Sequence, residues 1–397
     1  MKVLVALVLV VSAGDYERID TPIRVPCRLS QLGLTPKDVA DAQLVLREEG
    51  AEDIVPAQWD HGGDPDAQQG HIVWTLPGKT PKGTARTFHL VVRRGAEPMR
   101  SLTFALEKDE HIHIQKAGKP VLRYNHGLMS QFPDKPSKFD RACYFHPLWT
   151  PSGEIITGDF HPNHLHHRGL WFSWVKVKVG DRLANFWEIQ RGRGKTRNQS
   201  LLPVVGPVFA GFTARNVCTS GDKTVLRETV SCRLYAAPAA PHVFDVTISQ
   251  AAVEREVVLA KIHYGGLGFR GRDEWDGRKG KVEVLTSEGK SRKNANATHA
   301  RWFDYTGALP GGGWGGVIAL DHPQNARYPN RVRIHPHMCF ASFCLVQTGD
   351  YAIEKGEPLV RRYRFVVHEG KPDAARAERF AADFAHPPKV TLRPATK

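Results

Sequence analysis

The chain has 397 residues, of which 41% are hydrophobic and 24% are charged, a composition that is typical of a folded globular protein and excludes a disordered one. Its length exceeds the roughly 100–200 residues of one average domain, so we expect a large domain and a smaller one. The formal net charge of +14 raises the question of a nucleic-acid partner. The basic residues are scattered, however, and their densest run, residues 191–197, is short and interrupted by glycine. We therefore expect no nucleic-acid partner.

The first residues form an apolar run after Lys2, with small residues near Ala13, which is the order of a secretory signal peptide over residues 1–14. The run is too short to span a bilayer as a helix, which needs about 20 residues, and no other stretch predicts a membrane span. Because valine and leucine dominate, the alternative is a buried first strand. The signal peptide predicts a periplasmic or secreted protein, and the strand is compatible with a cytoplasmic one.

Strand patterns dominate the rest of the chain. Residues 15–110 are predicted to form a smaller β region, and residues 111–397 a larger β domain that carries the site. Residues 225–235 mix β-branched and polar side chains. Residues 243–249, and residues 359–368 over most of their length, alternate between apolar and polar side chains, which is the period of a strand with one buried face. The clearest helix pattern covers residues 373–384, between proline residues at both ends. We therefore predict an all-β fold with a short C-terminal helix.

The most informative stretch is a histidine-rich segment, in which four of the 19 histidines lie within residues 161–167. In an extended strand, His164 and His166 share one face and His167 takes the other. A same-face pair could hold a divalent metal ion together with a third ligand from elsewhere. Neutral histidine is also a common general acid or base near pH 7. The alternative is a solvated basic loop beside buried tryptophans.

Further candidate site residues are scattered over the following 160 positions. As acid–base groups we add Asp304 and His322 to the three histidines. As substrate-binding groups we expect guanidinium and amide donors and flat aromatic faces on which a sugar can stack: Arg168, Trp171, Trp187, Arg270, Asn325 and Arg327. Glu188 is a weaker carboxylate candidate. The alternatives are turn chemistry for residues 321–327 and a strand with one buried tryptophan for residues 185–188. If these residues serve one site, most of them should line one concavity.

Several common site types are not supported. The six cysteines form no CxxC pair, which argues against zinc-ribbon and thioredoxin sites, although Cys218 and Cys232 could meet across a hairpin in an exported protein or be buried hydrophobic residues. No GxSxG, HExxH, Walker or dinucleotide-binding motif is present. We therefore expect no nucleotide cofactor, and a divalent metal ion is the only cofactor considered.

A series of short motifs occurs in a fixed order. They are residues 120–124 (PVLRY), 145–148 (FHPL), 150–153 (TPSG), 164–171 (HLHHRGLW), 185–187 (NFW), 265–267 (GGL), 302–307 (WFDYTG), 322–325 (HPQN) and 363–370 (YRFVVHEG). This series resembles the bacterial PmoA-named domain family of unknown function over nearly the whole chain. The resemblance implies a galactose-mutarotase-like β supersandwich and a role in carbohydrate breakdown. Methane oxygenation is not expected, because the particulate methane oxygenase subunit is a multi-helix membrane protein and this chain has no spanning segment.

Together these patterns favour a carbohydrate-active enzyme that acts on a sugar or oxidised-sugar glycoside. Histidine or carboxylate groups would move the proton, with or without help from a metal ion on His164 and His166. The alternatives are a carbohydrate-binding protein without catalysis and a metal-binding domain. The sugar, the bond and the oligomeric state are left open by the sequence.

Overall fold

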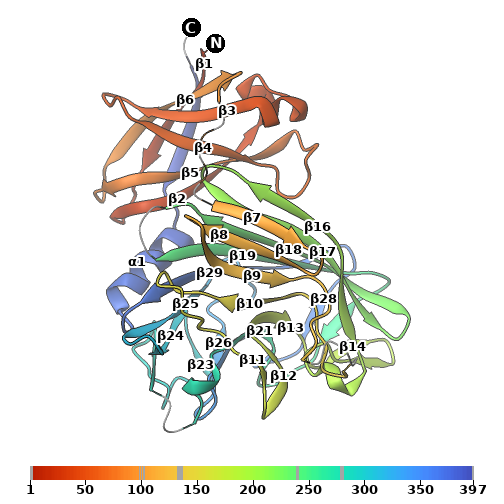
Figure 1. Ribbon diagram of the computed structural model, residues 1–397. Coiled ribbons are helices and arrows are strands. Elements are labelled where there is room, and N and C mark those ends of the chain that lie inside the picture. Colours follow the sequence, from red (N-terminus) through yellow and green to blue (C-terminus); the bar gives the residue numbers. More distant parts are fainter. Residues whose placement is uncertain are drawn as a thin grey trace.

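A computed structural model describes residues 3–97, 99, 101, 103–131, 137–237, 241–277 and 281–395. Figure 1 shows a smaller β domain, drawn mainly in red and orange, at one end of a larger β domain. Across these ranges the only α-helix is α1 (Ala374–Ala385), whose first turn is capped by the Asp373 carboxylate. The predicted all-β fold with a short C-terminal helix is therefore confirmed.

The smaller domain is one antiparallel sheet with the strand order β2-β5-β4-β3-β6-β1-β30 in the described part of the chain. Its strands are β1 (Val3–Ser12), β2 (Arg18–Arg28), β3 (Ala42–Glu48), β4 (Ile54–Asp60), β5 (Gln69–Thr80), β6 (Ala85–Arg94) and β30 (Lys389–Pro394), with the 3₁₀ helices η1 (Leu29–Leu32) and η2 (Pro36–Asp41). Because β30 pairs with β1, both ends of the chain build this sheet. The boundary expected near Glu110 lies at the turn between the first two strands of the larger domain.

The apolar N-terminal run forms β1, between β6 and β30. Leu7, Leu9 and Val11 point into the core of the smaller domain, beside Trp59 and Trp74. This is the strand alternative of the sequence analysis, and export stays a prediction. In the described ranges, no helix combines the length and the apolar character that a membrane span requires.

The larger domain is a sandwich of two antiparallel sheets. The first has the order β23-β26-β27-β21-β13-β10-β9-β8-β7 and the second the order β16-β17-β18-β19-β29-β25-β24-β22. The strands of the first sheet are β7 (Thr103–Lys108), β8 (His111–Lys116), β9 (Lys119–Asn125), β10 (Tyr144–Leu148), β13 (Leu170–Ser173), β21 (Gly266–Arg270), β23 (Thr298–His299), β26 (Arg331–Ile334) and β27 (Phe340–Cys344). Those of the second are β16 (Lys195–Val205), β17 (Phe209–Ser220), β18 (Lys223–Tyr235), β19 (His242–Ala252), β22 (Val282–Thr286), β24 (Trp302–Ala308), β25 (Trp314–Asp321) and β29 (Leu359–Glu369).

The core of the sandwich forms where these two sheets face each other. Phe145 and Phe269 of the first sheet belong to one buried cluster with Phe212, Phe244 and Phe365 of the second. Helix α1 covers the outer face of the second sheet, where its apolar side packs against β24 and β25. Three small parts extend from the sandwich: the hairpin β11 (Asp159–His161) and β12 (His164–Arg168), the sheet of β14 (Val177–Val179), β15 (Arg182–Ala184), β20 (Val257–Leu259) and β28 (Tyr351–Ile353), and the 3₁₀ helices η3 (Ile189–Arg191) and η4 (Asp273–Trp275).

All six cysteines are free thiols. Cys232 is buried in the sandwich core, and Cys218 is buried in a separate cluster beside β14 and β20. The suggested pairing of these two residues is therefore wrong, and both behave as small buried hydrophobic side chains.

Replacing Leu9 with alanine should lower the free energy of unfolding of the smaller domain by about 2–5 kcal/mol, because the change leaves a cavity in a core where Leu9 has no exposed surface. Chemical denaturation followed by tryptophan fluorescence measures this. Val8→Ala removes two methyl groups from the opposite, half-buried face of β1 and should cost less. Equal losses for the two variants would contradict the placement of β1.

Candidate functional site

The hairpin β11–β12 carries the histidine-rich segment on the edge of the sandwich. Asp159 pairs with Arg168 and His161 pairs with His164, with Pro162 and Asn163 in the turn. At the base of the hairpin, the Gly169 N–H donates to the Gly158 carbonyl. Gly169 has a φ of +25°, and a side chain there would collide with the Phe145 carbonyl oxygen, so only glycine fits this approach.

Three imidazole rings meet on this hairpin. The ring centroids of His164, His166 and His167 lie 4.7–5.7 Å from one another. The expectation that His167 would lie on the opposite face is wrong. The hairpin pairing is irregular: from the Asp159–Arg168 pair to the His161–His164 pair, β11 advances two residues and β12 four, so the strict alternation of faces is lost in β12. We call these three residues the imidazole cluster.

An aromatic layer supports the imidazole cluster from below. The His167 ring lies 5.0 Å from Phe340 and 5.3 Å from Trp171, and the Trp171 and Trp187 rings are 4.6 Å apart. Trp171 is 1% exposed and Trp187 is fully buried. The predicted role of these two tryptophans as sugar-stacking faces is therefore wrong, since no ligand outside the protein reaches them.

Burial sets the protonation of the imidazole cluster. The pKa of His166 is lowered to about 4, mainly by burial and next by the nearby His164. The pKa of His167 is held well below its usual value by burial and by the His166 ring, and burial also lowers the pKa of His164. The three imidazoles are therefore neutral at pH 7 and can each accept a proton.

Several buried polar atoms around the imidazole cluster have no hydrogen-bond partner among the described residues. They are Nδ1 of His164 and His167 and the indole nitrogens of Trp171 and Trp187. An unpaired buried donor or acceptor costs free energy, so such atoms in a folded protein are concentrated where function requires them or where water or a ligand completes the set.

Glu188, Gln190 and Tyr264 form the half-buried rim of the cluster. Gln190 Nε2 lies 3.5 Å from His166 Nδ1, and the Tyr264 hydroxyl donates to Glu188 Oε1 over 3.4 Å. Glu188 is also paired with Arg191, at 2.9 Å. Sequence reasoning did not place Gln190 and Tyr264 in the site, because they come from η3 and from the turn before β21, and only the fold brings them to the hairpin.

The two predicted substrate-binding arginines lie inside the protein. Arg168 has no exposed surface, and its guanidinium is paired with Asp159 at 3.1 Å and donates to the Phe139 carbonyl. Arg270 is equally buried, with its Nη2 2.6 Å from Asp276 Oδ2. The prediction that they contact substrate is wrong, because each guanidinium is buried against a carboxylate of its own.

Asp304 and His322 lie away from the imidazole cluster. Asp304 alternates along β24 with core-facing Phe303 and Tyr305, so it points to the outer face of the second sheet, where the Thr306 hydroxyl donates to it over 2.5 Å and His368 Nε2 lies 3.1 Å away. The His322 ring packs against Phe384 of α1.

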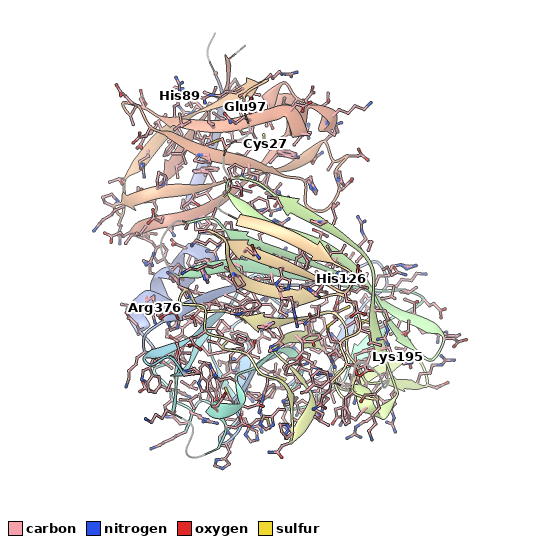
Figure 2. All side chains as sticks on the ribbon, viewed as in Figure 1. Cys27, His89, Glu97, His126, Lys195 and Arg376 are labelled. Atoms are coloured by element: carbon pink, nitrogen blue, oxygen red, sulfur yellow. The ribbon has the colours of Figure 1, made fainter. Side chains whose placement is uncertain are left out.

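Figure 2 labels Arg376 of α1, whose Nη2 lies 3.9 Å from Asp304 Oδ2, on one flank of the larger domain. The hairpin β11–β12, which carries the imidazole cluster, lies away from α1, at the lower end of the larger domain in Figure 1. The predicted participation of Asp304 and His322 in one shared site with the histidines is therefore wrong.

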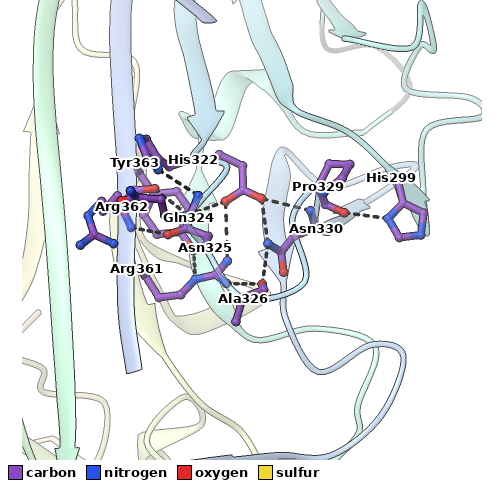
Figure 3. Close-up of polar contacts among 11 residues, drawn as sticks. His299, His322, Gln324, Asn325, Ala326, Pro329, Asn330, Arg361, Arg362 and Tyr363 are labelled. Atoms are coloured by element: carbon purple, nitrogen blue, oxygen red, sulfur yellow. Dashed lines mark hydrogen bonds and ion pairs between the residues drawn. The ribbon is translucent and has the colours of Figure 1, made fainter. Parts of the chain in front are cut away.

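Asn325 and Arg327 are held in loop networks. Asn325 donates to Asp321 Oδ1 over 2.6 Å and to the Arg362 carbonyl over 2.7 Å, while Asn330 donates to the other oxygen of Asp321. Figure 3 shows the network of polar contacts around Asn325 and Asn330. Arg327 donates to the carbonyls of Leu345, Gly349 and Asp350. Both residues therefore stabilise turns and loops, which was the alternative interpretation of residues 321–327, and their predicted role in substrate binding is not supported.

The described ranges hold no group of three or more histidine, cysteine, aspartate or glutamate side chains in an arrangement that fits a metal ion. His164 and His166 supply two imidazoles of the predicted metal site. A divalent ion there would take its further ligands from water or substrate, and the metal site stays a prediction.

Residues 111–382 match the family described as "Family of unknown function (DUF6807)", so the chain belongs to this family; the PmoA name is not part of that match. No curated protein matches the chain. An alpha-mannosidase structure from Enterococcus faecalis V583 is 10% identical with a TM-score of 0.39, and a glycosyl hydrolase family 38 protein from Enterococcus faecalis is 11% identical with a TM-score of 0.36. The alignments cover 98% of this chain and 46% and 47% of those chains, so the chain spans about half of their length.

The stability of the protein should fall as the pH drops from about 6.5 to about 4. Between these pH values the His166 side chain becomes protonated in the unfolded chain, whereas in the folded protein it stays neutral down to about pH 4. The unfolded state therefore binds more protons, and acid favours it. Replacing His166 with glutamine should reduce the slope of unfolding free energy against pH by up to about 1.4 kcal/mol per pH unit, measured by urea denaturation at several pH values. Identical slopes for the two proteins would contradict the buried, neutral state of His166.

Proposed function

We propose that this member of the DUF6807 family is a carbohydrate-active enzyme in which His166 moves a proton to and from a sugar bound at the imidazole cluster. The observation that carries the proposal is the meeting of three neutral imidazoles at 4.7–5.7 Å beside a half-buried rim. The Nδ1 atom of half-buried His164 has no hydrogen-bond partner among the described residues, which is typical of a site that binds a polar ligand.

His166 is the best placed proton acceptor of the cluster. It is half-buried, whereas His167 is 5% exposed and covered by the other rings. Because burial lowers its pKa to about 4, His166 is in its basic form at pH 7, and the imidazolium that forms on proton uptake is a strong acid. The same ring can therefore take a proton from a hydroxyl or from a carbon beside a carbonyl, and return it to a leaving oxygen or to the other face.

The rim supplies the remaining contacts for a sugar. Glu188 and Gln190 offer oxygen and nitrogen atoms to hydroxyl groups. Tyr264 and Met338 are partly buried hydrophobic side chains packed against the aromatic layer, so they can cover the apolar face of a sugar ring in place of the buried tryptophans. In this proposal, His167, Trp171 and Trp187 hold the rings of His164 and His166 in position.

Replacing His166 with glutamine should lower turnover by about 100-fold or more, because a positioned acid–base group contributes about 10²–10⁴ to the rate. Proton NMR in D₂O, with aldoses, uronates and keto-glycosides, detects anomer exchange, deuterium uptake beside a carbonyl and glycoside cleavage in one experiment. The wild-type activity toward uncharged sugars should decline only as the pH approaches about 4, the pKa of His166 without an anion nearby and well below the ordinary histidine value near 6.5.

His322→Gln is the matched control, because it makes the same change at a histidine that packs on α1. It should leave turnover unchanged. Sugar binding without any of the three reactions would instead identify a non-catalytic carbohydrate-binding protein, and equal activity of the two variants would remove His166 from the mechanism.

The alternative is a metal ion on His164 and His166, in which case His166 would be a ligand and not the proton acceptor. If these histidines are ligands, elemental analysis of protein purified without a histidine tag should find a divalent ion, and His166→Ala should lower its content, because one lost ligand of so few is hard to replace. An equal metal content in His166→Ala and in the wild type would contradict a metal ligand at this position.

A further inference from the structure

A pocket of about 360 Å³ opens beside the rim of the imidazole cluster. Its charged lining consists of four basic side chains, Lys138, Arg141, Lys195 and Arg197, and one carboxylate, Asp140. No ion pair of these four cations is found among the described residues, so the pocket carries an excess of positive charge. A concave basic surface of this size suits an anionic small molecule.

Arg141 is the cation at the inner wall of the pocket. It is 5% exposed, and its Nη2 donates to the Phe186 and Trp187 carbonyls over 2.7 Å each. Its Nε has no hydrogen-bond partner in the described chain. The pKa of Arg141 is lowered to about 9, mainly by burial and next by the positive charge of the nearby Arg168. A buried guanidinium held by neutral carbonyls alone is costly, and an anion in the pocket would offset that cost.

The pocket adjoins the proposed reaction site through Gln190. Gln190 lines the pocket, and its Nε2 lies 3.5 Å from His166 Nδ1. Arg141 also holds the carbonyl of Trp187, whose ring belongs to the aromatic layer. A ligand with an anionic group in the pocket can therefore present a neighbouring ring to His166.

We propose that this pocket binds the anionic group, a carboxylate or a sulfate, of an acidic sugar whose ring lies at His166. The assignment rests on the proposed function of the imidazole cluster, and it specifies the substrate class. Guanidinium and ammonium groups recognise both anions through charge-assisted hydrogen bonds.

The test compares the binding of glucuronate, glucose 6-sulfate and glucose by calorimetry, for the wild type and for the double variant Lys195→Gln/Arg197→Gln. Lys195 is exposed and Arg197 is half-buried, so replacing them leaves the core unchanged. At least one acidic sugar should bind the wild type about tenfold or more tighter than glucose, and the double variant should lose this preference while keeping its affinity for glucose. The tighter of the two acidic sugars identifies the anionic group. Lys82→Gln removes an exposed positive charge in the smaller domain and should change nothing.

Equal affinities for all three sugars, or a double variant that keeps the preference, would overturn the acidic-sugar assignment. Measuring the binding of inorganic sulfate, together with that of glucose, distinguishes failure of the acidic-sugar assignment from failure of the proposed carbohydrate function. If no sugar binds, the carbohydrate function and the acidic-sugar assignment both fall; sulfate binding that depends on Lys195 and Arg197 would then leave an anion site of another kind. If glucose binds but the acidic sugars gain nothing, the imidazole cluster remains a sugar site and only the anion pocket is refuted.

Discussion

The position of the candidate site depends on one buried ion pair. Arg270 ends β21 in the middle of the first sheet and has no exposed surface, so it requires a negative partner. Asp276 supplies it, and the same carboxylate accepts from the Cys339 N–H over 2.6 Å and contacts His161 Nε2 at 2.9 Å. One side chain thus joins the central strand, the segment before β27 and the end of the first hairpin strand, β11. The backbone adds to this connection, because the Arg270 N–H donates to Gly169 and the Arg270 carbonyl accepts from Gly158.

The β11–β12 hairpin lies against the aromatic layer, and this layer determines the protonation state of the hairpin histidines. Rings packed on Trp171 and Phe340 lose solvent, and loss of solvent disfavours the charged form of an imidazole. Neutral His167 stacks at low cost, whereas a protonated ring in the same place would need a counter-charge. The fold therefore selects the base form of the imidazole cluster through packing, and no carboxylate is placed directly on the cluster rings among the described contacts.

Much of the fold could be predicted from the sequence, because period-two alternation and the capped helix at residues 373–384 are local patterns. The histidine-rich segment was also singled out from sequence, since four histidines in seven residues are rare as core residues, but its hairpin was not predicted. Arg168 and Arg270 were misplaced because residue type gives no measure of burial. For Asp304, the sequence held a usable signal: Asp304 and Thr306 are out of phase with Phe303 and Tyr305, which predicts the outer face. Of the rim residues, Glu188 was a candidate from sequence, whereas Gln190, Tyr264 and Arg141 could not be found, since only the fold brings them to the hairpin.

The basic pocket and the imidazole cluster influence each other electrostatically. The positive charge of Arg141 is one of the contributions that lower the pKa values of His166 and His167, while Glu188 opposes it at His166. An anion beside Arg141 would cancel part of that repulsion and raise the pKa of His166 from about 4 toward neutrality. The strength of the base would then increase when an acidic ligand is bound, because a general base is most effective when its pKa lies near the working pH. If an acidic sugar binds as proposed, the group that recognises it would also activate His166, and an uncharged sugar would meet a weaker base in the same site.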